Sequence, residues 1–427
     1  MTDIFEDLKW RGLIHQTTAD DFLPGWLNSG SRTLYAGFDP TADSLHVGSL
    51  LPLMMLRRFQ KAGHKPIAIA GGATGMIGDP SGKSAERNLQ TQEQLDANLA
   101  GIEVQMRHVL DFECGDNSAI LVNNNDWMSK FSYIEFLRDV GKNFPVNVML
   151  AKDSVKSRLG SEAGLSYTEF SYMLLQAYDF AHLNKEYGCE LQIGGSDQWG
   201  NVTAGIDLGR RMNSVQLYGM TCPLLTTSTG AKMGKTESGA IWLSAEKTSP
   251  YQFYQYWVRV EDADTGKCLR FLTELSQEEI LDLDKARESD PQKRESQIRL
   301  AEEVTRMIHG EEGLKAAQLA TEIFFGKEIE NLTDAELGQI FSDVPSKDLS
   351  ADELVNDGGL GLIDAVVHAG LSKSKGEARR SIKQGSIYVN NSRKDDIEYK
   401  LAKKDLASET VVVIRSGKKK YALLRFK

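Results

Sequence analysis

Apolar and polar residues alternate along roughly the first 220 residues in a pattern that predicts strands and helices in turn. Residues 64–72 and 190–195 are short apolar runs that end in paired glycines, which is typical of buried strands followed by glycine turns. Between them, residues 133–140 and 169–183 have the spacing of amphipathic helices. Such alternation predicts an α/β fold with a parallel sheet covered on both faces, in which ligands bind beyond the carboxyl ends of the strands.

The pattern becomes helical and charged from about residue 249 to about residue 325. Pro250 opens a stretch with an aromatic face, and residues 276–283 and 293–309 continue with helix-forming residues. Residues 342–359 are rich in Asp, Ser, Pro and Gly, which is typical of a linker. The end of the chain has two short helical patterns and then strand patterns on either side of Ser416-Gly417, so we expect a small α+β module that ends in a hairpin.

Length and composition fit this organisation. A chain of 427 residues is too long for one core and predicts two or three domains. We place them at residues 1–228 (parallel-sheet domain), 229–330 (helical domain), 331–357 (linker) and 358–427 (α+β domain). The hydrophobic fraction of 41% and charged fraction of 26% are those of an ordinary soluble protein.

Targeting and metal signals are weak. No apolar run approaches the ~18 residues of a membrane span, so no membrane association is expected. The acidic N-terminus argues against export or organelle import. The four cysteines are widely spaced, so we expect neither a disulfide framework nor a zinc site, but reduced thiols in a cytoplasmic protein.

Charge is distributed unevenly. The whole chain carries −10, yet residues 371–427 hold 16 Lys and Arg against 6 Asp and Glu. An acidic body with a basic end predicts that this end binds a polyanion, and a merely solvated face is the less favoured interpretation.

Two short motifs point to phosphate chemistry. His46-Val47-Gly48-Ser49 precedes an apolar stretch, and small residues at a helix N-terminus leave free N–H groups that favour an anion. Lys232-Met233-Gly234-Lys235-Thr236 lies in a segment rich in Gly, Ser and Thr, where two ammonium groups can stabilise charge on an α-phosphate. In this order, the two motifs resemble the H-I-G-H and K-M-S-K-S signatures of class I aminoacyl-tRNA synthetases.

Residues 71–84 suggest a rival class, the P-loop NTPases and kinases. A P-loop needs Gly, four residues, and then Gly-Lys-Ser, but Ile77 stands where the first Gly is required. The rival also leaves the 232–236 motif unexplained, so we rank it well below the synthetases. A solvated helix face remains an alternative for Lys83 and Arg87.

Two further sequence patterns place polar side chains where a ligand is expected to bind. Tyr172, Gln176 and Asp179 are spaced i, i+4, i+7 in an otherwise apolar helical stretch, which places them on one face. Either structural hydrogen bonds or a polar ligand satisfies this stripe. Asp197 follows a strand and precedes a helix, where it serves either as an acceptor for a ribose or as an N-cap.

Taken together, the motifs resemble the bacterial tyrosyl-tRNA synthetases over the whole chain. The most specific segments are residues 35–41, 78–83, 172–179, 195–200 and 232–236. The resemblance implies a Rossmann-like catalytic domain, an α-helical anticodon-side domain and a C-terminal RNA-binding domain related to a ribosomal protein. It also implies a homodimer whose partners are L-tyrosine, ATP and tRNA(Tyr), with Mg²⁺ accompanying ATP and no tightly bound cofactor.

The resemblance also assigns residues to roles. Its tyrosine site comprises Tyr35, Asp79, Asn124, Tyr172, Gln176, Asp179 and Gln198, of which Tyr35 and Asp179 hold the phenolic hydroxyl. Its ATP site comprises Asp39, Gly48, Ser49, Gly195, Asp197 and Lys235. Its catalytic set comprises Thr41, His46, Lys83, Arg87, Lys232, Lys235 and Thr236. Its tRNA contacts comprise Arg210, Arg211, Lys418, Lys419 and Lys420.

Three positions depart from the family pattern. Ser49 stands in place of the second His of the first motif, Ala36 in place of a frequent Cys, and Gly234 and Thr236 make the second motif K-M-G-K-T. None removes a Lys or Arg, so we expect activity to survive. Two alternatives are less favoured. An RNA-binding regulator built on an inactive synthetase would require loss of the charged ATP residues, yet all are present, namely His46, Lys83, Arg87, Lys232 and Lys235. The sibling tryptophanyl enzyme is disfavoured by the Tyr35/Asp179 pair and the basic tail.

Overall fold

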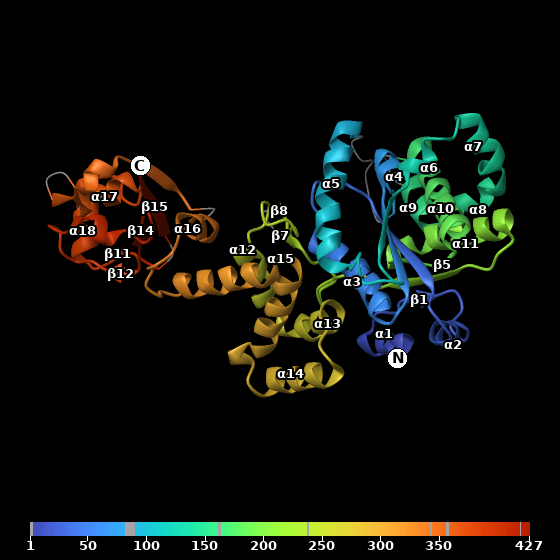
Figure 1. The fold of residues 1–427 in the computed structure, drawn as a ribbon, viewed down its shortest axis with the longest axis horizontal. Helices are drawn as coiled ribbons and strands as arrows, with labels where there is room; N and C mark the ends of the chain where they lie inside the picture. Colours follow the sequence, from blue (N-terminus) through green and yellow to red (C-terminus); the bar gives the residue numbers. More distant parts are fainter. Residues whose placement is uncertain are drawn as a thin grey trace. The chain divides into compact units, whose positions relative to one another are not determined.

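The computed structural model describes residues 3–81, 90–160, 164–236, 239–341, 344–355, 358–418 and 420–427. The chain forms two compact units (Figure 1). The first unit comprises Met1–Thr248 and Tyr256–Ile308, and the second comprises Ser249–Gln255 and His309–Lys427. The predicted boundary at residue 228 does not coincide with this division, because residues 256–308 belong with the parallel sheet.

A six-stranded sheet forms the centre of the first unit. Its strand order is β1 (Gln16–Thr17), β6 (Tyr218–Cys222), β5 (Cys189–Gly195), β2 (Thr33–Phe38), β3 (Lys65–Ala70) and β4 (Ile120–Asn123). All pairs are parallel except that of β1 with β6, which confirms the predicted parallel sheet. The chain runs from β2 outward to β4 and returns on the other side of β2 as β5, so the strand order reverses between β2 and β5. Ligands bind at such a switch point.

Helices cover both faces of this sheet, as the sequence predicts (Figure 1). One face packs against α3 (Val47–Lys61) and α5 (Gln92–Val109), and the other against α10 (Tyr167–Tyr187) and α11 (Trp199–Asn213). Phe180 and Leu183 of α10 form one core cluster with Tyr35, Ile67 and Ile69 of the strands. The predicted amphipathic stretch at 169–183 therefore lies within one long buried helix.

Shorter elements complete the first unit. They are α1 (Ile4–Arg11), α2 (Leu23–Asn28), α4 (Gly72–Ile77), α6 (Asn125–Met128), α7 (Tyr133–Asp139), α8 (Val146–Leu150), α9 (Asp153–Leu159), the β7 (Lys235–Thr236) and β8 (Gly239–Ala240) hairpin, α13 (Asp262–Leu272) and α14 (Gln277–Ser289). Two helices contribute to both units, α12 (Pro250–Val258) and α15 (Glu295–Phe324). The backbone of α15 leaves helical geometry at Gly310, where φ is 71°. These helices confirm the helical character predicted for residues 249–325.

The second unit contains the predicted α+β module. Its five-stranded sheet has the order β12 (Ser392–Arg393), β11 (Ile387–Val389), β14 (Val411–Ser416), β15 (Lys420–Phe426) and β9 (Ser346–Leu349). Around it lie α16 (Asp334–Ile340), α17 (Leu362–His368), α18 (Lys375–Lys383) and the β10 (Leu360–Gly361) and β13 (Lys400–Leu401) pair. The predicted hairpin is confirmed, since β14 pairs antiparallel with β15 and Gly417 takes a φ of 65° at the turn.

Residues 331–357 were expected to form a linker, but they contain regular structure. Strand β9 pairs in parallel with β15, and Leu337 and Phe341 of the α16 region are buried in one core cluster with Val413 and Leu423. The strand and cluster partners come from the end of the chain, whereas Thr333 and Glu336 form a capping box that starts α16 locally. None of the helices within the described ranges is long and apolar enough to span a membrane.

Candidate active site

A cavity of about 350 Å³ opens at the carboxyl ends of β2 and β5, in the first unit. Its lining combines the ends of these strands with the start of α3, one face of α10 and the segment around residues 232–235. The sequence places these segments up to about two hundred residues apart, and the strand order brings them to one edge of the sheet.

Most of the predicted site residues line this cavity. They are Tyr35, Asp39, Thr41, His46, Gly48, Ser49, Asp79, Asn124, Tyr172, Gln176, Asp179, Gly195, Asp197, Gln198, Lys232 and Lys235. Ala36 also lines it.

The other predicted residues lie elsewhere. Arg210 and Arg211 are at the end of α11, where both pair with Asp207 at 2.6 and 2.8 Å. Lys418 and Lys420 are exposed in the second unit. Lys83, Arg87, Lys419 and the side chain of Thr236 lie outside what the structure describes. Among the described residues, no group of three His, Cys, Asp or Glu side chains is placed to hold a metal ion.

A buried carboxylate lies at one end of the cavity. Asp179 is 2% exposed and accepts hydrogen bonds from Asn124 Nδ2 at 3.0 Å and Trp127 Nε1 at 2.8 Å. Burial raises the pKa of Asp179 to about 7, although the two donors act to lower it. The hydroxyl of the neighbouring Tyr35 is buried and has no hydrogen-bond partner within the described residues. Burial, and then the Asp179 charge, raise the pKa of Tyr35 well above its ordinary value, so this hydroxyl stays protonated. The pair therefore offers one acceptor and one free hydroxyl to a polar group entering between them.

The middle of the cavity is lined by amide and carboxylate groups. Gln198 Nε2 donates to Asp79 Oδ2 at 2.6 Å, and Gln176 Nε2 donates to Gln198 Oε1 at 3.2 Å. Tyr172 donates its hydroxyl hydrogen to Asp39 Oδ2 at 3.0 Å. The polar stripe predicted on α10 thus makes structural hydrogen bonds and also faces the cavity. Two carboxylates, Asp39 and Asp79, make this region suited to a cation.

The first motif begins α3, as predicted. His46 is the N-cap residue of the helix, with extended backbone (φ −112°, ψ 168°), and its side chain is exposed. A Cβ at Gly48 would lie 2.8 Å from the His46 ring, so only glycine lets the imidazole lie across the first turn. Gly48 and Ser49 of this first turn line the cavity, and the helix dipole favours an anion there.

The second motif is part of a hairpin that lies directly against the first. Lys232 forms a β-bridge with Thr226, and β7 pairs with β8. Gly234 has a φ of +83°, and a Cβ there would lie 2.1 Å from Val47 Cγ2. Val47 N donates to Ile241 O at 3.1 Å, which ties the hairpin to the start of α3. Lys232 and Lys235 are exposed and line the cavity on the same side as His46.

Asp197 lies in a short 3-10 turn between β5 and α11, as its sequence context predicts. A Cβ at Gly195 would lie 2.7 Å from Asp197 Oδ1, so glycine is needed for the carboxylate to fold back toward the strand end.

Trp127 was missed from the sequence, although it donates to Asp179. It comes directly after the polar run Asn123-Asn124-Asn125-Asp126, which begins at the last residue of β4. A single indole after such a run belongs to no periodic pattern from which its burial could be predicted. Its N–H is the only feature that pointed to a polar partner, because a buried Trp needs one.

These features are those of an α/β protein that binds a ligand in the crevice at the switch point of its parallel sheet. Comparison with known proteins narrows the class. A family profile described as tRNA synthetases class I (W and Y) matches residues 28–326, and one described as tyrosine–tRNA ligase SYY-like C-terminal domain matches residues 336–424.

Individual relatives agree with the profiles. A tyrosine–tRNA ligase from Rhodopirellula baltica is 58% identical over 422 residues, which are 99% of this chain and 96% of the relative. One from Roseiflexus castenholzii is 52% identical over 425 residues, covering both chains completely. The solved C-terminally truncated mitochondrial tyrosyl-tRNA synthetase of Aspergillus nidulans has a TM-score of 0.68 and 33% identity, covering 75% of this chain and 94% of its own. The chain belongs to the tyrosine–tRNA ligase family of class I tRNA synthetases.

Proposed function

We propose that this protein activates L-tyrosine with ATP and transfers it to the 3′ end of tRNA(Tyr). The observation that carries the proposal is the cavity itself, which has a buried hydroxyl–carboxylate pair at one end and two lysines beside a helix N-terminus at the other. An amino acid with a phenolic side chain fits the first end, and the phosphates of ATP fit the second.

The tyrosine end supplies both charge and hydrogen-bond complementarity. The phenolic hydroxyl donates to Asp179 and accepts from Tyr35, whose hydroxyl otherwise has no partner in the described part of the chain. The ammonium group lies toward Asp79, with Tyr172, Gln176, Asn124 and Gln198 around it. Phenylalanine would add no donor to the two that Asp179 already has, Asn124 and Trp127, and it would leave the Tyr35 hydroxyl unsatisfied. An unsatisfied buried group costs about 1–3 kcal/mol.

At the other end, Lys232, Lys235 and His46 face the phosphates, and Asp197 and Gly195 face the ribose. Thr41, Gly48 and Ser49 also line the cavity and are assigned to ATP from the sequence, as are Asp39, Lys83, Arg87 and Thr236. ATP enters with Mg²⁺ as its counterion. Lysine charges that are fixed before the reaction stabilise the negative charge that grows on the α-phosphate.

The reaction has two steps. The tyrosine carboxylate attacks the α-phosphate of ATP, which forms tyrosyl-adenylate and releases pyrophosphate. A ribose hydroxyl at the 3′ end of the tRNA then attacks the acyl carbon and releases AMP. No side chain acts as a nucleophile, so catalysis consists of positioning and electrostatic stabilisation.

Exchange of pyrophosphate into ATP, measured separately with each of the twenty amino acids, tests this proposal. Tyrosine should support exchange, and phenylalanine and tryptophan should support little. Exchange with tryptophan instead would favour the sibling specificity, and no exchange with any amino acid would favour an RNA-binding regulator. Charging of a tRNA transcript with labelled tyrosine then tests the second step.

We further infer that two copies of the chain pair through the surface of α7, α8, α9 and the first turn of α10. This surface exposes seven large hydrophobic side chains, namely Tyr133, Ile134, Val146, Val148, Leu150, Leu159 and Tyr167. Tyr133 and Tyr167 hydroxyls lie 3.2 Å apart, so the ends of α7 and α10 are adjacent. Large exposed apolar patches mark interaction sites. Analytical ultracentrifugation should give a dimer for the wild type and monomer for Ile134→Asp; a wild-type monomer would contradict the inference.

A cytoplasmic location is part of the same proposal. It is supported by the cysteines, which are free thiols in the structure, three of them buried.

A further inference from the structure

The hairpin that carries the two lysines is held by three side chains of α12 and α13 in addition to its contacts with α3. We define the lysine loop as residues 225–236. Within it, Met233 N donates to Leu225 O at 2.9 Å and Thr227 N donates to Ala231 O at 2.8 Å, so the loop is closed by its own backbone. These bonds fix the shape of the loop but do not fix its position against the cavity.

Tyr256 contacts the loop between the two lysines. Its hydroxyl accepts a hydrogen bond from Gly234 N at 2.8 Å. Burial raises the pKa of Tyr256 to about 12, although this hydrogen bond acts to lower it, so the hydroxyl is neutral at physiological pH. Gly234 also packs on Val47, so Tyr256 and the start of α3 both contact this residue.

Asp264 and Lys267 contact the other strand of the loop. The Asp264 side chain is 3% exposed, and its Oδ1 accepts from Ser228 N at 2.6 Å. Lys267 Nζ donates to Thr226 O at 3.1 Å. A buried carboxylate needs such donors, because an unpaired buried charge is costly. Cys268, one residue further along α13, places its sulfur 3.7 Å from that of Met233 in the loop.

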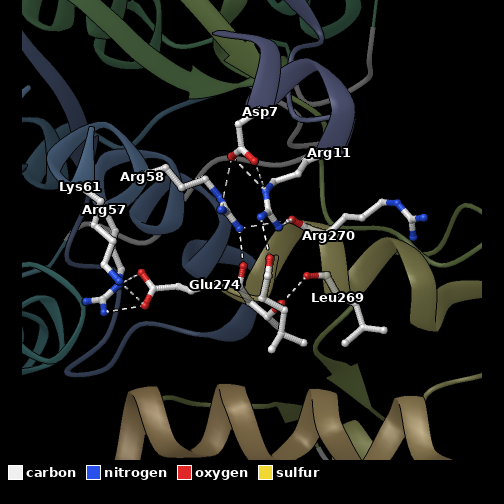
Figure 2. A network of polar contacts seen from close by, with 10 residues as sticks. Asp7, Arg11, Arg57, Arg58, Lys61, Leu269, Arg270 and Glu274 are labelled. Atoms are coloured by element: carbon white, nitrogen blue, oxygen red, sulfur yellow. Dashed lines mark hydrogen bonds and ion pairs between the residues drawn. The ribbon is translucent and has the colours of Figure 1, made fainter. Parts of the chain in front are cut away.

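Helix α13 is itself fixed at its other end (Figure 2). Arg11 from α1 and Arg58 from α3 both donate to Arg270 O in the last turn of α13 (Figure 2). Arg11 donates to Leu275 O at 2.8 Å and Arg58 to Thr273 O at 2.5 Å, and both side chains are nearly buried. Guanidinium groups here satisfy carbonyls that the helix cannot pair internally. Helix α13, which contacts the loop, is therefore itself anchored to both α1 and α3.

We propose that Tyr256 and Asp264 are positioning residues for the first reaction step: they hold the lysine loop so that Lys232 and Lys235 face the phosphates. This inference rests on the proposed function. Neither residue lines the cavity. Both act through the loop. They should therefore affect the stabilisation of the negative charge that grows on the phosphates, and not the binding of tyrosine.

The test uses the full-length chain with three substitutions at the two residues. Tyr256→Phe removes only the hydroxyl. Asp264→Ala removes the acceptor, whereas Asp264→Asn keeps one acceptor oxygen and should recover part of the loss. The matched control is Asp262→Asn, since Asp262 lies on the same helix and contacts Gln297 rather than the loop.

Tyrosine-dependent pyrophosphate exchange should show a kcat lowered about tenfold for Tyr256→Phe and Asp264→Ala, with the KM for tyrosine unchanged. Amide hydrogen exchange at Gly234 and Ser228 should become faster in the respective variants. The control should change neither quantity.

If the two residues had a purely structural role, their variants would have lower thermal stability, but the kcat of the folded fraction would be unchanged. That result would overturn the proposal. Faster amide exchange with unchanged kcat would overturn it as well. If the wild type itself showed no exchange with tyrosine, the proposed function would fail; if the wild type were active and the variants matched it, only this inference would fail.

Discussion

Asp179 lies where it can accept a hydrogen bond from a ligand, although its burial disfavours the charged carboxylate when no ligand is bound. Two hydrogen-bond donors, Asn124 and Trp127, do not compensate for its burial, and its pKa rises to about 7. A third donor would favour the carboxylate, and the phenolic hydroxyl of tyrosine is such a donor. Under the proposed function, tyrosine would supply this third donor.

This pKa predicts a pH dependence of tyrosine binding. The carboxylate that accepts from the phenol forms as pH rises through about 7, so the dissociation constant for tyrosine should decrease between about pH 6 and pH 8. Equilibrium dialysis with labelled tyrosine would measure it. Asp179→Asn cannot ionise, and its weaker binding should be independent of pH over this range. A wild-type constant that does not vary with pH would contradict the assignment of Asp179.

Lys235 should act on the transition state more than on substrate binding. It is exposed and lines the cavity, next to Gly234, which packs against the start of α3. Removing one such charge typically costs roughly 10²–10³ in rate. For Lys235→Ala we therefore expect a decrease of this size in the rate of adenylate formation, measured in a single turnover, with little change in tyrosine affinity. A defect confined to tyrosine binding would give the loop a different role.

At the scale of the elements, α3 links the site to the periphery of the first unit. Its first turn carries His46 and Gly48, and its last turns carry Arg57, Arg58 and Lys61. Glu274, which follows α13, pairs with Arg57 at 2.6 Å and with Lys61 at 2.6 Å (Figure 2). At its first turn, α3 therefore carries the residues that we assign to the phosphates. At its last turns it pairs with Glu274, next to α13, the helix that contacts the lysine loop.

The Glu274 pairs predict an acid-dependent loss of stability. Burial acts to raise the pKa of Glu274, but Arg57 and Lys61 outweigh it and lower the pKa from 4.5 to about 2. A lowered carboxylate pKa stabilises the fold above about pH 5, and this contribution is lost as pH falls toward 2. Because the side chain is 27% exposed, we expect about 1–2 kcal/mol.

Urea unfolding from pH 7 to pH 3 would measure this contribution. Glu274→Gln should be less stable than the wild type at pH 7, and the difference should shrink as pH falls. Glu113→Gln, an exposed residue in a loop, is the control and should show no such trend. A difference between Glu274→Gln and the wild type that is constant with pH would mean that the charge is not responsible.

At the scale of the whole molecule, the basic end of the chain should matter for tRNA and not for adenylate formation. We expect Lys418→Glu with Lys420→Glu to lower tRNA charging while pyrophosphate exchange stays at the wild-type level. The dependence of tRNA affinity on salt should become shallower by about 0.7–0.9 in log–log slope for each phosphate that a lysine no longer neutralises. Filter binding across a salt series would measure it, with Lys185→Glu in the first unit as the control.

Charge reversal is a better test than deletion of the basic end. A chain that ended near residue 357 would keep β9 without β15 and would expose the α16 residues that pack on Val413 and Leu423. Wild-type charging by the double variant would remove the RNA-binding role from these lysines. Loss of pyrophosphate exchange would show that the second unit also supports the active site.

The sequence by itself determined the chemistry and the local structure. The two lysines, the His46 turn and the polar stripe on α10 are short-range patterns, and each needs only its own helix or turn to form. The same holds for the final hairpin, which Gly417 and the flanking apolar residues specify. Family resemblance then gave each of these residues a role.

Only the tertiary structure decided which of these pieces meet. The order of strands placed the first motif against the second, and β15 ordered a segment whose composition is that of a linker. Trp127, Tyr256 and Asp264 acquire their contacts only across the fold, since their partners lie 52, 22 and 36 residues away. A periodic pattern in the sequence predicts which face of a helix or strand is buried. The hydrogen-bond partners on that face depend on how elements distant in the sequence pack against it.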